Sequence, residues 1–369
     1  MTLATRGPVR IVGTGLLGTS VGLALTAQGV DVVLHDPSRT ALALARDVGA
    51  GRPASPTDMT PALIVVAAPP DVTADVVRAE LAAYPDAVVT DVASVKGYVL
   101  AELRSSGADL GRYVGSHPMA GRERSGPSAA VPDLFLGRPW VVCDSGSSHP
   151  DAVLAVRSLA VDLGAVPVAM DADAHDAAVA AVSHVPQVAA SLVAARLSGA
   201  DDAALALAGQ GLRDVTRLAA SDPALWTSIL AANAAAVRDV LVDLRTDLDG
   251  VIDALGRAAV ADGPETVELG ALAALAQAIA DGNAGVARIP GKHGGAQRTY
   301  GVVSVLVPDA PGELARLLTE VGEAGVNLED LHLEHAAGRP VGMAEISVLP
   351  GRVEHLEAEL TARGWRLVS

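Results

Sequence analysis

The amino-acid sequence predicts an α/β protein of three parts: a doubly wound parallel sheet, an all-α helical domain and a small C-terminal βαββαβ unit. Short β-branched runs alternate with helical patterns from residue 9 to about 168, which is typical of a parallel sheet. Helical patterns alone follow Met170. A Gly- and Pro-rich stretch then precedes a second set of strands and helices. The predicted domains are residues 1–170, 171–288 and 299–369, with a linker at 289–298.

The first domain contains seven apolar runs of strand length, separated by helical patterns. The expected strands are residues 9–13, 31–35, 63–67, 87–91, 113–116, 139–143 and 165–168. Helices are expected between them, for instance at 38–47, 72–83 and 151–163. Because this alternation is typical of helical crossovers, we expect the strands to run parallel.

A glycine pattern after the first strand predicts a dinucleotide site. Residues 13–18 read G-T-G-L-L-G between a β-branched run and an apolar helical pattern, which is the context of the Rossmann fingerprint. Gly13 permits the tight turn, Gly15 lets backbone N–H groups approach a pyrophosphate, and Gly18 lets helix and strand pack closely. The helix N-terminus faces the phosphate charge.

The end of the second strand predicts NAD as the cofactor. The Asp36 carboxylate can accept hydrogen bonds from the ribose hydroxyls and repels a 2′-phosphate. Arg39 is close enough in the sequence to leave some NADP use open, and a flavodoxin-like turn without a cofactor is the alternative that Asp36 disfavours. The residues assigned to the cofactor are Gly13, Gly15, Leu16, Leu17, Gly18, Asp36, Arg39 and Pro69.

Composition excludes several classes of partner. A chain of 369 residues is long enough for two or three domains. The formal net charge of −16 argues against nucleic acid and anionic membranes.

Cys143 is the only cysteine, which fits a reducing cytoplasm, and the first strand begins too early to leave room for a signal peptide. The stretch 177–197 is Ala-rich and interrupted by polar residues, so we expect a buried helix and no membrane span.

The helical domain contains a long amphipathic pattern. Ser221-Asp222-Pro223 is typical of a helix start. Apolar residues then recur at alternating spacings of four and three, at Val237, Leu241, Leu244, Leu248, Val251 and Leu255. A narrow seam of this length packs against another long helix, which predicts a homodimer interface or, alternatively, an intrachain bundle.

Two strand ends carry residues suited to catalysis. Residues 91–97 read D-V-A-S-V-K-G after the fourth strand, where ligands of open α/β sheets bind, so Ser94 and Lys96 could reach one. Alternatively, Ser94 caps the following helix. Residues 115–121 read G-S-H-P-M-A-G after the fifth strand. His117 is suited to take a proton near neutral pH, and a merely satisfied buried histidine is the alternative.

A third cluster lies in the helical domain. Ser183-His184-Val185-Pro186 precedes G-L-R-D-V-T-R at residues 211–217. Arg213 and Arg217 lie one helical turn apart and could clamp a carboxylate. Solvent-exposed arginines paired with Asp214 or Asp222 are the alternative. No residue pattern leads us to assign a metal ligand.

Taken in order, these motifs resemble the prephenate/arogenate dehydrogenase family of tyrosine biosynthesis. The resemblance covers about residues 8–285, and it is carried by residues 13–18, 91–97, 116–121, 183–186 and 211–226. The C-terminal unit resembles an ACT domain, a regulatory amino-acid-binding module, at residues 307–314 and 325–331. Its elements are expected at 301–307, 312–324, 326–334, 341–348, 352–363 and 365–368.

The resemblance implies roles for individual residues. The family transfers a hydride from the ring carbinol to NAD while the ring carboxylate leaves as carbon dioxide. His117 would draw off the hydroxyl proton, with Ser94 beside it as the second catalytic residue, whereas Lys96 has no assigned role. The residues assigned to the substrate are His184 for its side chain, Arg217 and Arg213 for a carboxylate, Trp226 from the partner subunit, and Glu123 and Asp214 at the pocket entrance.

The sequence leaves the identities of the substrate and of the effector open. Gln187 stands where some relatives carry a second histidine, so prephenate and arogenate both remain candidates. An effector, with tyrosine the natural choice, would bind at Asp309, Gly312 and Asn327; phenylalanine or a role in assembly are alternatives. A β-hydroxyacid dehydrogenase would need a catalytic lysine in the helical domain, which the chain lacks. A catalytically dead NAD-dependent sensor would have lost His117, Ser94 or Arg217.

Overall fold

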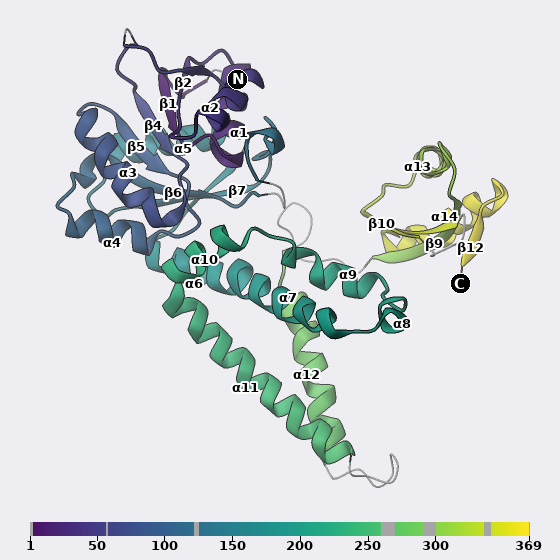
Figure 1. Cartoon of the computed structure of the whole chain (residues 1–369). Helices are drawn as coiled ribbons and strands as arrows, with labels where there is room; N and C mark the ends of the chain where they lie inside the picture. The colour runs from purple at the N-terminus through teal and green to yellow at the C-terminus, as the bar shows by residue number, and fades with distance from the viewer. Residues whose placement is uncertain are drawn as a thin grey trace. The chain divides into compact units, whose positions relative to one another are not determined.

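The computed structural model describes residues 3–56, 58–121, 125–259, 270–290, 300–335 and 341–368. Two compact units divide the chain, at residues 1–246 and 247–369. The first unit contains the large sheet and most of the helical region, and the second contains the small sheet (Figure 1).

The large sheet has eight strands in the order β3-β2-β1-β4-β5-β6-β7-β8. They are β1 (Val9–Val12), β2 (Val32–His35), β3 (Arg52–Pro53), β4 (Leu63–Val66), β5 (Val88–Asp91), β6 (Tyr113–Pro118), β7 (Pro139–Asp144) and β8 (Val166–Ala169). The seven expected strands are confirmed to within two residues at each end, and the short edge strand β3 was not expected.

The expectation of a parallel sheet is wrong at one pair of strands. Strand β7 runs antiparallel to β6, and β8 then pairs parallel with β7. Parallel neighbours need a crossover connection, usually a helix. In the described part of the β6–β7 connection, the helical structure is a 3₁₀ turn at Pro127–Ala129. The chain therefore returns along the edge of β6 in the opposite direction.

Helices cover both faces of this sheet, as expected for a doubly wound domain (Figure 1). They are α1 (Leu16–Ala27), α2 (Arg39–Asp47), α3 (Pro70–Ala83), α4 (Gly97–Ser105) and α5 (Pro150–Asp162). One apolar core joins the sheet to α1 and α5 through residues such as Leu25 and Leu159. The other joins it to α3 and α4 through Val77 and Leu103. Proline suits the first position of α3 and α5, because an N–H at that position would have no partner within the helix.

The helical region begins with one continuous helix from Ala172 to Gly199. It contains α6 (Ala172–Val179), a π-helical turn at Ala180–His184, and α7 (Val185–Arg196). Pro186 has no N–H to give to the carbonyl four residues earlier, and its ring crowds that carbonyl. The turn before it widens to the π form, which often occurs at functional sites. His184 is the last residue of that turn.

The same helix is long and apolar enough to span a membrane by length and composition alone, with a third of its apolar window buried inside the protein. Core helices of folded domains pass the same test. The expected buried helix is therefore only partly buried. It is followed by α8 (Asp202–Leu205), α9 (Gln210–Thr216), α10 (Pro223–Ala232) and α11 (Ala234–Ala259).

The second unit contains α12 (Ala271–Val286) and a four-stranded antiparallel sheet in the order β10-β11-β9-β12. Its elements are β9 (Gly301–Pro308), α13 (Glu313–Glu323), β10 (Asp330–His335), β11 (Val341–Val348), α14 (Val353–Ala362) and β12 (Arg366–Val368). The order is βαββαβ, as predicted. Inward residues of β9 pack with Leu317 and Leu356 from the two helices. Strand β10 starts four residues later than expected.

Candidate active site

The glycine loop after β1 is shaped by close backbone approach. Gly13 has φ +102°, and a Cβ there would lie 2.3 Å from the carbonyl oxygen of Ala67. A Cβ at Gly18 would meet the carbonyl oxygen of Gly13. Gly15 differs, because a Cβ there would have no atom within 4 Å. The loop is therefore tight where helix and strand meet, and open at the N-terminus of α1, which fits a dinucleotide pyrophosphate.

Asp36 lies beside this loop at the end of β2. Its Oδ2 accepts hydrogen bonds from the Thr14 N–H at 2.6 Å and the Thr14 hydroxyl at 2.9 Å, and its Oδ1 accepts from the Ser38 N–H at 2.7 Å. A carboxylate offers about four acceptor positions, so one stays available for a ribose hydroxyl. Arg39 begins α2 close by and is exposed.

The other residues predicted to bind the cofactor lie at the start of α1 and after the strand next to β1. Leu16 and Leu17 form the first turn of α1, half-buried, directly after the open glycine. Pro69 is the N-cap of α3, after β4, which is the strand next to β1.

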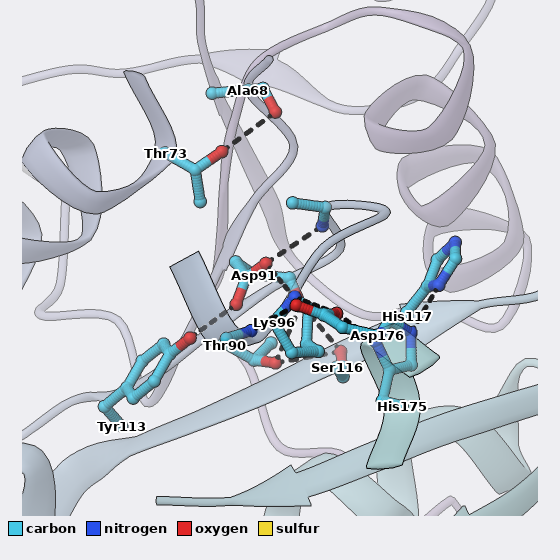
Figure 2. A network of polar contacts seen from close by, with 12 residues as sticks. Ala68, Thr73, Thr90, Asp91, Lys96, Tyr113, Ser116, His117, His175 and Asp176 are labelled. Atoms are coloured by element: carbon cyan, nitrogen blue, oxygen red, sulfur yellow. Dashed lines mark hydrogen bonds and ion pairs between the residues drawn. The ribbon is translucent and has the colours of Figure 1, made fainter. Parts of the chain in front are cut away.

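A buried ionic network lies beneath the ends of β5 and β6 (Figure 2). Lys96 and Asp91 form an ion pair, with side chains 1% and 0% exposed. The Tyr113 hydroxyl donates to Asp91 Oδ2 at 2.7 Å, and the Ala93 N–H donates to Oδ1 at 2.9 Å. Burial, and then the Asp91 charge, raise the pKa of Tyr113 well above its ordinary value. Lys96, which had no assigned role, therefore compensates a buried carboxylate.

His117, which the sequence predicts to be a catalytic base, is buried. It lies in β6, only 8% exposed, with its Nδ1 2.9 Å from Nε2 of His175 in α6. His175 Nδ1 in turn lies 2.7 Å from Asp176 Oδ1. Burial, followed by His175, Lys96 and His184, holds the pKa of His117 well below its ordinary value. The imidazole is neutral near pH 7, the form that accepts a proton.

Asp176 caps α4 from a distant part of the sequence. Its Oδ1 accepts the Lys96 N–H and its Oδ2 accepts the Gly97 N–H, both at 2.8 Å. The alternative that Ser94 caps this helix is wrong, because the N-cap residue is Lys96. Ser94 is half-buried beyond the end of β5, and its hydroxyl makes no hydrogen bond within the described part of the chain.

His184 has a ring nitrogen with no hydrogen-bond partner among the described residues. Asn233 Nδ2 donates to the backbone oxygen of Asp176 at 2.8 Å and lies 3.2 Å from His184 Nδ1. Because that nitrogen of Asn233 is a donor, His184 Nδ1 accepts and its proton sits on Nε2. Nε2 is buried and has no hydrogen-bond partner in the described part of the chain. Burial lowers the pKa of His184 to about 4.

Trp226 lies beside this histidine within the same chain. Its ring meets His184 edge-on, with ring centroids 6.0 Å apart, and it packs partly against the core that contains Ile229. The resemblance implies that this tryptophan reaches the site of the partner subunit, and that role stays a prediction. Here the residue contributes to the histidine cluster of its own chain.

The predicted carboxylate-binding residues lie on the helix surface. Arg213 and Asp214 in α9 are exposed, as is Arg217 directly after it. Asp214 accepts a hydrogen bond from Gln210 at 2.8 Å, and Asp222 caps α10. Glu123 lies outside the described residues. No group of three or more His, Cys, Asp or Glu among the described residues could hold a metal ion.

Sequence reasoning missed His175, Asp176 and Asn233. Their positions follow from contacts between segments 49 to 80 residues apart in the chain. One signal was present: a histidine and an aspartate are adjacent in the first helix after the sheet domain. A buried His–Asp pair beside a candidate base is a known way to orient that base.

An open dinucleotide loop and a buried neutral imidazole at the carboxyl ends of strands of one sheet define a nicotinamide-dependent dehydrogenase. The comparisons with known proteins give the family. Residues 21–169 match the family described as prephenate dehydrogenase, nucleotide-binding domain, and residues 171–263 match prephenate dehydrogenase, dimerization domain. The chain belongs to the prephenate dehydrogenase family and is an NAD-dependent oxidoreductase.

Three similar proteins illustrate this. The Streptomyces niveus protein named Probable prephenate dehydrogenase NovF is 41% identical over 357 residues, covering 96% of this chain and 98% of that protein. Arogenate dehydrogenase from Synechocystis is 26% identical with a TM-score of 0.59, covering 75% of this chain and 99% of that one. Aquifex aeolicus prephenate dehydrogenase, crystallised with hydroxyphenyl propionate and NAD+, shares the fold at 24% identity and a TM-score of 0.65, covering 78% and 100%.

Proposed function

We propose that the protein oxidises prephenate to 4-hydroxyphenylpyruvate, with loss of carbon dioxide, in tyrosine biosynthesis. The observation that carries the proposal is a neutral, buried His117 together with a His184 donor that has no partner among the described residues, at the same edge of the sheet as a loop that fits a dinucleotide. Family membership and the similarity to NovF over nearly the whole chain support it. The proposed domains are those predicted from the sequence.

His117 is the proposed catalytic base. Its Nδ1 is occupied by His175, and Nε2 makes no hydrogen bond within the described part of the chain, so Nε2 takes the proton of the ring hydroxyl. The carbon that bears this hydroxyl would give its hydride to NAD, which the glycine loop would hold. The bond to the ring carboxylate then breaks, the ring becomes aromatic, and the phenolate oxygen takes the proton back. Ser94 would hold the hydroxyl in place during these steps.

The proposed substrate residues approach from the helical region. Arg217 and Arg213 would bind a carboxylate of the substrate, with Asp214 and Glu123 at the pocket entrance. Helix α9, which contains Arg213 and Asp214, packs against α7. Helix α7 begins directly after His184 and contains Gln187. Trp226 would close the apolar side of the ring site beside His184.

His184 favours prephenate over arogenate. Its Nε2–H is a buried donor and can pair with the side-chain keto oxygen of prephenate. The ammonium group that arogenate carries at that position has only donors, so it would leave both groups unsatisfied. Gln187 is nearby but is engaged with Ser221 and Ser191 at 3.4 Å.

Measuring initial rates of NADH formation with prephenate and arogenate tests this proposal. We expect kcat/KM to be higher for prephenate, and His184→Gln, which can still donate, to keep that preference better than His184→Leu. Arogenate as the better substrate would overturn the specificity. Inactivity with both substrates, with NAD still bound, would overturn the dehydrogenase assignment and favour a sensor.

Helix α11 supports a homodimer through the helical domain. Val237, at its start, is buried against residues of its own chain, whereas Leu244, Leu248 and Leu255 are 42%, 54% and 51% exposed. A seam of exposed leucines on a helix of 26 residues is suited to pack against a second copy. A second support is the match of residues 171–263 to the dimerization domain of the family. We also propose a cytoplasmic location, as for other biosynthetic enzymes of this kind.

The C-terminal unit is proposed to be an ACT-like regulatory domain that binds tyrosine. Its βαββαβ order and antiparallel sheet support this. Asp309 and Gly312 lie in the exposed turn before α13, where N–H groups of the first helical turn lack helical partners, and Asn327 follows the same helix. We expect tyrosine to inhibit the wild-type enzyme and Asn327→Ala to weaken that inhibition. An equal response to phenylalanine, or no response, would reassign the effector or leave the unit a role in assembly.

A further inference from the structure

His117 is the last member of a hydrogen-bonded row that begins at the N-terminus of α4. The row runs from the Lys96 and Gly97 N–H groups through Asp176 and His175 to His117 (Figure 2). We propose that His175 and Asp176 are positioning residues that keep the His117 proton on Nδ1, so that Nε2 is the base. This inference rests on the proposed function, in which His117 takes the hydroxyl proton.

The direction of the row follows from what each atom can donate. Both Asp176 oxygens accept backbone N–H groups, and an ionised carboxylate has no proton to give. His175 Nδ1, 2.7 Å from Oδ1, must therefore be the donor. In the neutral form of His175, which has one N–H, Nε2 accepts. The atom that faces it is His117 Nδ1 at 2.9 Å, which is therefore protonated.

The anchor of the row is built for a carboxylate. The first N–H groups of a helix have no partner within the helix and lie at its positive end. Asp176 uses two of them, and the contact depends on a missing side chain: a Cβ at Gly97 would lie 2.9 Å from Asp176 Oδ2. This gives a reason for glycine at position 97, which closes the D-V-A-S-V-K-G motif. His175 is 0% and Asp176 is 8% exposed, so water cannot replace the row.

The row acts on the reaction through charge as well as orientation. When His117 Nε2 takes the hydroxyl proton, its Nδ1–H keeps donating to His175, and the Asp176 charge lies one ring further along. The other ionisable groups whose charge affects His117 are Lys96, which is paired with Asp91, and His184. When the proton returns to the phenolate oxygen, His117 is restored in the same tautomer.

The test reads the tautomer directly in the full-length protein. Histidine-selective 15N labelling distinguishes a protonated Nδ1 from a protonated Nε2, and His117→Asn assigns the signal. We expect His117 to be protonated on Nδ1 in the wild type and in Asp173→Asn, a matched loss of charge at an exposed position of the same helix. In Asp176→Asn we expect a proton on Nε2 or a mixture. A wild-type proton on Nε2, or the same tautomer in Asp176→Asn, would overturn the proposal.

Kinetics give a second readout. We expect Asp176→Asn to lower kcat by about 10²-fold, at the lower end of what a general base contributes, with KM for NAD within about twofold of wild type. His175→Phe fills the same space without a ring nitrogen, and it should give the same loss if Asp176→Asn does not fold. An unchanged kcat in either folded variant would contradict the proposal. The tautomer is measured without substrate. The NMR result therefore distinguishes an error in the proposed hydrogen-bonded row from an error in the proposed substrate.

Discussion

The glycine loop and the histidine cluster lie at the same edge of one sheet but are built on different principles. The loop is formed by the absence of side chains, since Gly13 and Gly18 permit contacts that a Cβ would prevent. The cluster is formed by buried polar side chains from β6, α6, the π turn and the residue that joins α10 to α11. The loop should therefore be sensitive to added volume, and the cluster to changes of charge and of hydrogen-bonding capacity.

The largest effect is expected at the base. His117→Asn keeps a polar side chain but removes the proton acceptor, so kcat should fall by about 10²- to 10⁴-fold. The affinity for NAD should stay within about threefold, because the loop is separate from the cluster. Steady-state kinetics with prephenate and a fluorescence titration with NAD measure the two quantities. A loss below tenfold would show that His117 is not the base.

The ion pair beneath the cluster should give the next largest effect. Lys96→Met leaves the Asp91 carboxylate buried without its counter-charge, which should lower the free energy of unfolding by about 3–5 kcal/mol. Urea denaturation measures this change. The double variant Lys96→Met/Asp91→Asn should recover part of the loss, because the buried charge is gone. A single variant as stable as the wild type would refute a role for this pair.

Substitutions at two glycines distinguish the effect of the loop on stability from its effect on NAD binding. Gly13→Ala should lower the free energy of unfolding by about 1–3 kcal/mol, because it combines a positive φ with a clash at the Ala67 carbonyl. Gly15→Ala meets no protein atom within 4 Å, so stability should be unchanged while NAD binds more weakly. Thermal unfolding with and without NAD measures both. If Gly15→Ala binds NAD like the wild type, the pyrophosphate does not pass there.

The last prediction is a pH dependence of stability. Burial lowers the pKa of His184 to about 4, and the pKa of His117 also lies well below its ordinary value. Between about pH 6.5 and 4 the unfolded chain binds protons at these histidines that the folded protein does not, so stability falls as the pH falls. Urea midpoints across this range measure it. His184→Leu should flatten the dependence, and an equally steep curve would contradict the assignment.

The sequence predicted what depends on local pattern. The glycine loop, Asp36 and His117 each lie at a strand end, where a few neighbouring residues determine the backbone, and all were placed correctly. The direction of β7 was not, because it depends on a connection without a long helix. His175, Asp176 and Asn233 could not be placed, because their partners come from segments far apart in the chain. The exposed positions of Arg213 and Arg217 match the alternative that their spacing alone favoured.

The most direct measurement of the central claim is the stoichiometry of products from prephenate. NADH, carbon dioxide and 4-hydroxyphenylpyruvate are followed together with wild-type enzyme and with His117→Asn. The structure predicts equal amounts of all three from the wild type, at a rate that collapses in the variant. NADH without carbon dioxide would identify a simple hydroxy-acid dehydrogenase, and equal rates from both proteins would contradict the role of His117.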